Sequence, residues 1–350
     1  MHLSELFAIR ADPAAGVYLS LTRRCPLHCA HCSTRSTPHA EQHSAEPFLR
    51  LVGSFRPDLR PEVVSLTGGE PLLRPRLVAE LAALATASGA STMLLSGMFF
   101  AASGRTPPAI RRALEPLDHV SASIDRFHER EVPRRTVIAV MRSLLDDGKQ
   151  VSVHLTGDDA GDPYLDRVIG EIRRELGDRC PIYVALVAPV GRAAGWLEPQ
   201  NEPRGAAAEP CRLASWPVVT FDGTVVACAS QAALDGPVPD HLRLGHASDD
   251  DWAAISRRAA ESPMLRAIRT FGPRWLADND GDGACQGYCE SCLGLGGHAG
   301  LAGRVEERMR RPAIGLIERH AAETRPGAGE WVQPARFAHL LDLGREVVPA

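Results

Sequence analysis

The sequence lacks any apolar run close to the roughly 18 residues that a membrane-spanning helix needs. It also lacks an excess of positive charge, because 39 Lys and Arg residues face 43 Asp and Glu residues and give a formal net charge of -4. Such a chain offers no general attraction for nucleic acid or for an anionic membrane surface. Its first five residues show none of the features of a secretory signal peptide. We therefore expect a cytoplasmic protein that binds neither nucleic acid nor membrane.

Cysteine is too scarce for a disulfide scaffold, since nine cysteines are spread over 350 residues. Six of them lie in two short clusters, at positions 25, 29 and 32 and at positions 285, 289 and 292. In a reducing compartment, clustered cysteines are typical of metal or redox sites. The composition is otherwise that of a globular protein, with 44% hydrophobic and 23% charged residues.

Segments typical of β-strands alternate with helical segments through the first half of the chain. Strands are predicted at 17–22, 63–67, 91–95, 119–124, 151–155 and 182–188. Helices are predicted at 46–55, 76–87, 134–145 and 164–176. This alternation predicts an α/β protein with a parallel sheet. Periodicity alone leaves open whether the sheet closes into a barrel.

The pattern changes after residue 190, and the second half is predicted to form a smaller α+β unit. Residues 191–210 are rich in Gly, Ala and Pro and are typical of a connector. A β-hairpin is expected at 217–227 around Asp222-Gly223, because Asp-Gly is a favoured two-residue turn. A loop at 277–283 is expected to lead into the second cysteine cluster. The predicted domains are 1–190, 211–300 and a helical tail at 301–350.

The first cysteine cluster lies in a loop directly after the first predicted strand. Cys25, Cys29 and Cys32 can ligate three irons of a [4Fe–4S] cluster and leave the fourth iron open to chelate a small molecule. The loop alone leaves an alternative open, a structural zinc ion with His28 or His31 as the fourth ligand.

The spacing Cys-x3-Cys-x2-Cys, followed by Gly68-Gly69-Glu70 after the second strand, resembles the radical S-adenosylmethionine (SAM) superfamily. The resemblance covers about residues 16–190 and favours the cluster over zinc. It implies a partial (β/α)6 barrel with the cluster and SAM at the carboxyl ends of the strands. It also implies that Gly68, Gly69 and Glu70 line the methionyl group of SAM, with the glycines admitting the ligand close to the backbone.

Further SAM contacts are implied by position. His31 stands where the family often has an aromatic ring against adenine, with a solvated loop histidine as the alternative. Ser123 and Asp125 stand where ribose or sulfonium contacts occur, with strand-end capping as the alternative. Asp125 is also a candidate catalytic residue. The segment that contains Arg192 resembles a Pro-x-Gly-Arg-Ala sequence common in relatives with cysteine-containing C-terminal domains.

Several other polar groups lie after the fourth and fifth predicted strands or near the end of the fifth. They could face a substrate, but each is expected to be a solvated loop group: His128, Glu129, His154, Asp158 and Asp159. Cys180 is expected to be a small buried apolar residue.

The remaining cysteines resemble part of a SPASM/twitch domain, which holds auxiliary iron–sulfur clusters. The pattern is incomplete, because five cysteines cannot fill two four-thiolate clusters. The resemblance implies one auxiliary [4Fe–4S] cluster, with these ligands: Cys211, Cys228, Cys289 and Cys292. Cys285 is then an alternative ligand or a thiol hydrogen donor, and a zinc knuckle is the alternative for the whole set.

The resemblance implies that one electron from the reduced first cluster cleaves SAM to a 5′-deoxyadenosyl radical, which abstracts a substrate hydrogen. Flavodoxin or ferredoxin would supply the electron. The expected substrate is a ribosomally made precursor peptide that is cross-linked or epimerised. Alternatives are a small-molecule antibiotic or sugar intermediate, or a non-catalytic zinc-bound interaction module. Only some fifteen residues precede the first strand, so no fused peptide-recognition domain is expected there, which counts against a peptide unless a separate protein delivers it.

Overall fold

The computed structural model describes residues 1–198, 209–283, 287–324 and 328–345. Its central feature is one nine-stranded sheet with the strand order β6-β5-β4-β3-β2-β1-β7-β8-β9. The first six strands are mutually parallel. The strands are β1 Gly16–Ser20, β2 Val63–Thr67, β3 Ser91–Ser96, β4 His119–Ile124, β5 Gln150–Gly157, β6 Ile182–Leu186, β7 Val218–Val219, β8 Thr224–Val226 and β9 Arg243–His246.

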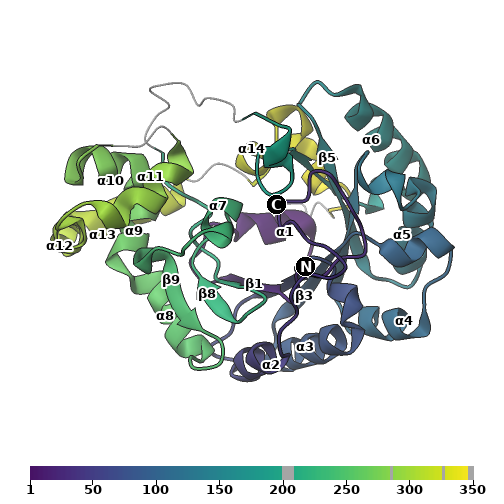
Figure 1. Ribbon diagram of the computed structural model, residues 1–350, viewed down its shortest axis with the longest axis horizontal. Helices are drawn as coiled ribbons and strands as arrows, with labels where there is room; N and C mark the ends of the chain where they lie inside the picture. Colours follow the sequence, from purple (N-terminus) through teal and green to yellow (C-terminus); the bar gives the residue numbers. More distant parts are fainter. Residues whose placement is uncertain (199–208, 284–286, 325–327, 346–350) are drawn as a thin grey trace.

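Helices cover the outer, convex face of the curved sheet (Figure 1). They are α2 Glu46–Gly53, α3 Pro75–Ser88, α4 Pro108–Leu114, α5 Arg134–Asp146 and α6 Pro163–Leu176. Side chains alternate between the two faces of each strand, so Val17 and Leu19 of β1 are fully buried while Tyr18 lines an inner cavity. The fold is therefore α/β with a mostly parallel, open barrel-like sheet, as predicted. The short helices α1 Leu3–Ala8 and α4 were not predicted.

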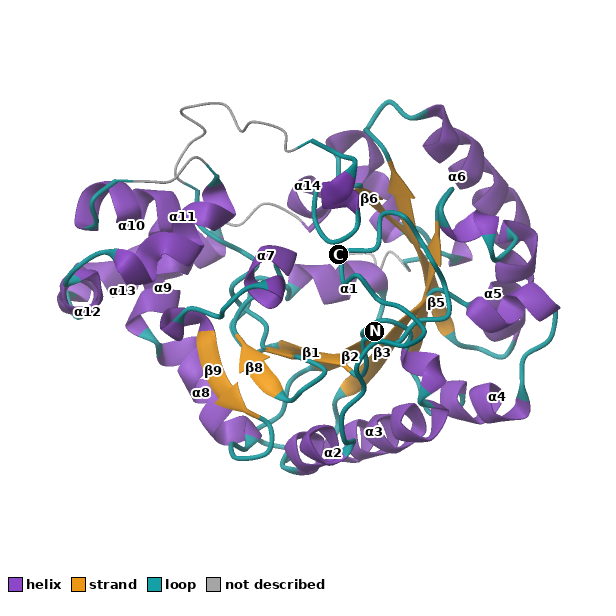
Figure 2. Cartoon of the chain, viewed as in Figure 1, coloured by secondary structure: helices purple, strands orange, loops and turns teal. Residues whose placement is uncertain are grey.

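Helix α1 lies on the inner, concave side of the sheet (Figure 2). Its Phe7 ring contacts the Tyr183 ring of β6 with a centroid separation of 5.0 Å. The helix therefore covers part of the barrel interior with apolar side chains, and the cavity that remains is bounded by α1 as well as by the strands.

The predicted hairpin is present, but its connection is longer than a two-residue turn. Thr220 N–H donates to the Thr224 carbonyl at 2.9 Å, so residues 221–223 form the loop. Gly223 has φ +95°, a left-handed conformation that suits glycine and is common in three-residue hairpin loops. Strand β7 pairs in parallel with β1, with Tyr18 opposite Val218, so the hairpin extends the barrel sheet.

The C-terminal helices are α7 Gln231–Asp235, α8 Trp252–Glu261, α9 Pro263–Phe271, α10 Pro273–Asp280, α11 Tyr288–Gly294, α12 Leu301–Met309, α13 Pro312–Glu323 and α14 Ala328–Val332. Buried side chains of α7 and α8 join the barrel core, whereas most of those of α9, α10, α12 and α13 form a second, smaller core. The prediction of a loop over 277–283 was wrong for its first part, because Leu276 and Ala277 are buried in this core and continue a helix. Within the described ranges, every helix is too short or too polar to cross a bilayer.

Candidate functional site

The first cysteine loop follows β1 at the carboxyl edge of the parallel strands. Cys29 is buried, while Cys25 and Cys32 are half-buried. Burial raises the pKa of Cys25 to about 12. Burial also opposes ionisation of Cys32, but hydrogen bonds from Thr34 and Ser36 and the charge of Arg192 outweigh it and lower its pKa. The loop therefore offers three thiols at the edge where ligands of parallel α/β sheets bind.

Arg192 braces this loop from the segment after β6. Its Nε donates to the Cys29 carbonyl at 2.8 Å, and its Nη1 donates to the Ser36 carbonyl at 2.6 Å. Its backbone N–H donates to the Cys32 carbonyl at 2.9 Å. The neighbouring Gly191 has φ +56°, and a Cβ there would lie 2.2 Å from the Ser33 carbonyl oxygen. The geometry accounts for Arg192 as a support of the cysteine loop; direct contact with SAM stays a prediction.

The Gly68-Gly69-Glu70 turn contacts the same loop. Gly69 N–H donates to the Thr22 carbonyl at 2.6 Å, and Glu70 N–H donates to the Arg24 carbonyl at 2.9 Å. A Cβ on Gly69 would lie 2.4 Å from the Arg24 carbonyl oxygen, and one on Gly68 would lie 2.6 Å from that of Thr22. Glycine is needed at both positions because the turn approaches the cysteine loop closely, a requirement that the sequence analysis did not identify.

The Glu70 side chain is fully buried and hydrogen-bonded within the chain. Its carboxylate accepts from the Leu72 N–H, the Ser96 hydroxyl and the Gly97 N–H, each at 3.0 Å. Burial raises its pKa to about 7 even though these hydrogen bonds favour the charged form. The carboxylate therefore ties the turn after β2 to the end of β3. Its predicted contact with SAM remains untested.

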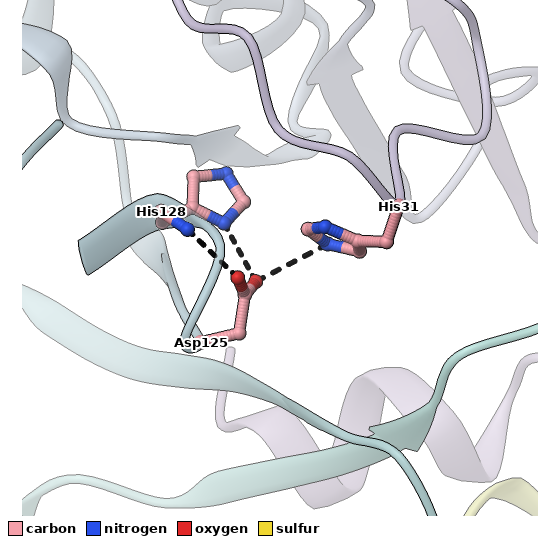
Figure 3. Close-up of side chains that lie close together, drawn as sticks. All are labelled: His31, Asp125 and His128. Carbon is pink, nitrogen blue, oxygen red and sulfur yellow. Dashed lines mark hydrogen bonds and ion pairs between the residues drawn. The ribbon is translucent and has the colours of Figure 1, made fainter. Parts of the chain in front are cut away.

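Asp125, directly after β4, joins two histidines (Figure 3). Its carboxylate is 2.6 Å from His128 Nδ1 and 3.2 Å from His31 Nε2, and it also accepts from the His128 N–H at 2.9 Å. His31 lies in the cysteine loop and stacks on Phe127 with a centroid separation of 4.6 Å. The pair of His31 and Asp125 is therefore a second attachment of the cysteine loop to the sheet.

This cluster is strongly polarised. Burial opposes charge on Asp125, but hydrogen bonds from His128 and His31 outweigh it and hold its pKa well below the ordinary value. Burial likewise opposes charge on His128, but hydrogen bonds to Asp125 and Cys29 raise its pKa to about 10. Asp125 is only 1% exposed, so its fixed charge acts in a low-dielectric setting. Ser123 is half-buried and lies opposite His154 in the β4–β5 register.

Three of the groups expected to be solvated are instead engaged in the structure. His128 belongs to the Asp125 cluster, and Glu129 accepts from Arg134 and from the Tyr164 hydroxyl. His154 lines the inner cavity. The i,i+3 spacing of Asp125 and His128 could have indicated their contact. Asp158 is exposed but also pairs with Arg126 at 2.6 Å, whereas Asp159 is exposed and Cys180 is buried, as predicted.

The second cysteine set comes together from three segments of the chain. The four thiols predicted as auxiliary ligands all line the inner cavity: Cys211, Cys228, Cys289 and Cys292. Burial, followed by the nearby Cys211 thiol, raises the pKa of Cys228 to about 12. Ser230 N–H donates to Cys228 Sγ at 3.3 Å, and His241 Nε2 lies 3.9 Å from Cys292 Sγ. Cys285 lies outside the described residues.

The spacing of the thiols can be compared with the needs of single ions and clusters. A tetrahedral zinc ion with bonds of about 2.3 Å holds its sulfurs only about 3.8 Å apart. In the described part of the chain, one group of three ligand atoms lies within 4.8 Å of one another, and it is His31, Asp125 and His128 rather than any cysteine triplet. Among the described residues, neither cysteine set thus brings three ligand atoms within 4.8 Å of one another.

The inner cavity, which is lined by the second cysteine set, has a volume of about 910 Å³. Its lining comprises α1, inward-facing residues of β1 to β6 and the second cysteine set. This size lies within the range of roughly 300–1,000 Å³ for small-molecule sites. Its walls are mostly apolar, with a few polar and charged side chains among them.

An open parallel barrel with a three-cysteine loop at its carboxyl edge defines a class of metal-cofactor proteins. Residues 19–138 match the family described as "Radical SAM superfamily", so the chain contains a radical SAM domain. Similar curated proteins include GTP 3′,8-cyclase of Desulforamulus reducens, 35% identical over 89 residues that make up 24% of this chain and 27% of that protein. Another is PqqA peptide cyclase of Streptomyces rochei, 32% identical over 120 residues, 33% of this chain and 32% of that protein.

The matches therefore span about a third or less of these relatives, and the enzyme names support an enzyme. Two solved structures share the fold. Streptococcus suis SuiB bound to precursor peptide SuiA has a TM-score of 0.51 at 12% identity, over 75% of this chain and 67% of that one. Native anSMEcpe with bound AdoMet and Cp18Cys peptide has a TM-score of 0.50 at 12% identity, over 87% and 99%.

Proposed function

We propose that this chain is a radical SAM enzyme in which Cys25, Cys29 and Cys32 hold a [4Fe–4S] cluster that binds SAM. The observation that carries the proposal is the cysteine loop itself. It stands at the carboxyl edge of the sheet and is tied down by Arg192 and by the turn that contains Gly69. The match of residues 19–138 to the radical SAM family supports the cluster over the zinc alternative.

When bound, the cluster and SAM supply a 5′-deoxyadenosyl radical that abstracts hydrogen from an unactivated C–H bond. The chain's own residues orient the bound groups and exclude water. Arg192 donates to the carbonyls of Cys29 and Ser36 and would thereby hold the three thiols in place around the cluster. Asp125 keeps His31 against Phe127, beside the expected adenine site. Flavodoxin or ferredoxin is the proposed electron donor.

We also propose one auxiliary [4Fe–4S] cluster on Cys211, Cys228, Cys289 and Cys292. The convergence of four thiols from distant segments on one cavity supports it. Hydrogen-bond donors near two of the sulfurs, Ser230 and His241, would stabilise thiolate charge and influence the potential of a bound cluster.

The substrate that we propose is a precursor peptide, modified by cross-linking or epimerisation. The similarity to PqqA peptide cyclase over 33% of the chain supports this choice. A separate protein would deliver the peptide. A small molecule is the second candidate, and the similarity to GTP 3′,8-cyclase over 24% of the chain favours it.

Iron content and SAM cleavage test the proposal together. Anaerobically reconstituted protein should hold about eight irons per chain, and Cys25→Ala/Cys29→Ala/Cys32→Ala protein about four. The triple variant should form no 5′-deoxyadenosine from SAM with dithionite as reductant. Cys180→Ala is the matched control, because Cys180 is buried away from both sets, and it should keep both properties. Unchanged 5′-deoxyadenosine formation in the triple variant, or colourless zinc-loaded protein, would contradict the proposal.

A further inference from the structure

Arg10 lies just after α1 and lines the inner cavity. Its side chain is buried, with only 3% of its surface exposed. The guanidinium stands 5.3 Å from the Tyr18 ring centroid and 5.1 Å from that of Trp216. Trp216 Nε1 in turn donates to the Ile9 carbonyl at 3.2 Å, which fixes the tryptophan beside the arginine. The guanidinium is therefore held in one position by two rings at the cavity wall.

The hydrogen bonding of this guanidinium is incomplete. Nη2 reaches the Leu213 carbonyl at a long 3.5 Å, and Nη1 has no hydrogen-bond partner among the described residues. Arginine stays protonated in proteins and carries five N–H donors. No carboxylate of the described part of the chain forms an ion pair with it. A buried cation without a counter-ion is unfavourable for folding alone, which makes it a feature to explain.

No carboxylate of the described cavity wall pairs with Arg10, although the Arg10 charge favours the thiolate form of Cys228, one of the proposed auxiliary ligands. Besides Arg10, the charged side chains of the wall are Arg212, which stacks on Trp331, and Glu209, which is exposed. His154 and Tyr183 face the same space as neutral groups. Burial lowers the pKa of His154 to about 4 and raises that of Tyr183 to about 12. Arg10 is thus a buried positive charge without a carboxylate partner among the described residues, in a mostly apolar cavity that it shares with the proposed auxiliary cluster.

We propose that the inner end of the cavity binds the carboxylate of an otherwise apolar substrate group, with Arg10 as its counter-ion. A planar guanidinium suits a carboxylate, because two parallel N–H donors can meet its two oxygens. One guanidinium balances a single negative charge, whereas a phosphate would need more donors and more positive charge. The inference rests on the proposed function only in taking this cavity as the substrate site.

For a peptide substrate, the carboxylate would come from an Asp or Glu side chain or from the chain's C-terminus. Both sources can be represented by small probes with an apolar body. 4-Phenylbutanoate represents a side-chain carboxylate, and N-acetylphenylalanine represents a C-terminal one. The corresponding amides, 4-phenylbutanamide and N-acetylphenylalanine amide, have the same shape without the charge.

Isothermal titration of the reconstituted protein with these four probes, without SAM or reductant, tests the proposal. Wild type should bind at least one carboxylate about tenfold or more tighter than its amide, because losing one partner of a buried charge pair costs at least that much. Arg10→Met should abolish the preference, and Arg10→Lys should keep part of it, since a lysine provides charge without the paired donors. Arg212→Met is the matched control and should keep the preference.

The unfolding midpoint separates binding from a purely structural role. If Arg10 serves a ligand, Arg10→Met removes a buried charge that has no carboxylate partner and should unfold at the same or a higher temperature. A lowered midpoint with the carboxylate preference intact would overturn the proposal. So would equal binding of carboxylate and amide by wild type, or no binding of either. Because 5′-deoxyadenosine formation is measured separately, its loss with retained carboxylate binding would contradict the proposed function alone.

Discussion

Replacement of Glu70 by Gln should change how stability depends on pH. Burial raises the pKa of Glu70 from 4.5 to about 7 in the folded chain. The folded state therefore holds this proton at higher pH than the unfolded state does. The stability that the protonated carboxyl contributes is fully present below pH 4.5 and is lost as the pH rises to about 7. The full difference corresponds to about 3 kcal/mol of unfolding free energy.

Unfolding by urea, followed anaerobically by far-ultraviolet circular dichroism on reconstituted protein, measures this contribution. Glu70→Gln also alters the hydrogen bonds to Ser96 and Gly97, which adds an offset that does not vary with pH. The informative quantity is how the unfolding free energy changes with pH. Relative to wild type, the unfolding free energy of the variant should rise by up to about 3 kcal/mol between pH 5 and pH 8. Glu80→Gln, at an exposed position of α3, is the control and should run parallel to wild type. Parallel curves for Glu70→Gln and wild type would refute the reasoning.

Three further outcomes can be checked in simpler assays. Gly69→Val should lower both cluster absorbance and SAM affinity, because a Cβ would lie 2.4 Å from the Arg24 carbonyl oxygen; intact absorbance would contradict this. Arg192→Met should release iron from the first cluster faster on chelator challenge, because two hydrogen bonds to the cysteine loop are lost, and equal rates would count against bracing. Cys285→Ala should keep about eight irons while Cys289→Ala keeps about four, and equal losses would make Cys285 a ligand.

The strands were predictable because their apolar, β-branched runs are continuous. β2 and β4 have the predicted bounds, since each is flanked by clear turn or helix signals. α1 has only six residues, too few for a helical period to show. α10 was missed because Asp278 and Asn279 are typical of loops, whereas Leu276 is held in the second core by contacts with distant helices. Tertiary packing overrode local preference there.

The cysteine sets were predictable for a different reason, because the number of residues between ligands can be counted in the sequence. What the sequence could not indicate is how each loop is held. Arg192 donates to the Cys29 carbonyl, 163 residues earlier in the chain. The position of the Arg10 guanidinium, which has no carboxylate partner among the described residues, can be recognised only when α1, β1 and Trp216 are brought together. Such contacts depend on the fold as a whole and leave no local pattern.

The pairing of β7 with β1 has a consequence for synthesis of the chain. Tyr18 lies opposite Val218, so the partner of the first strand emerges from the ribosome about ten to forty seconds later at common elongation rates of about 5–20 residues per second. Until then, the backbone edge of β1 lacks its strand partner and can pair with other nascent chains. Mutations that weaken the hairpin should therefore reduce the yield of soluble protein during expression more than they reduce the stability of molecules that have already folded.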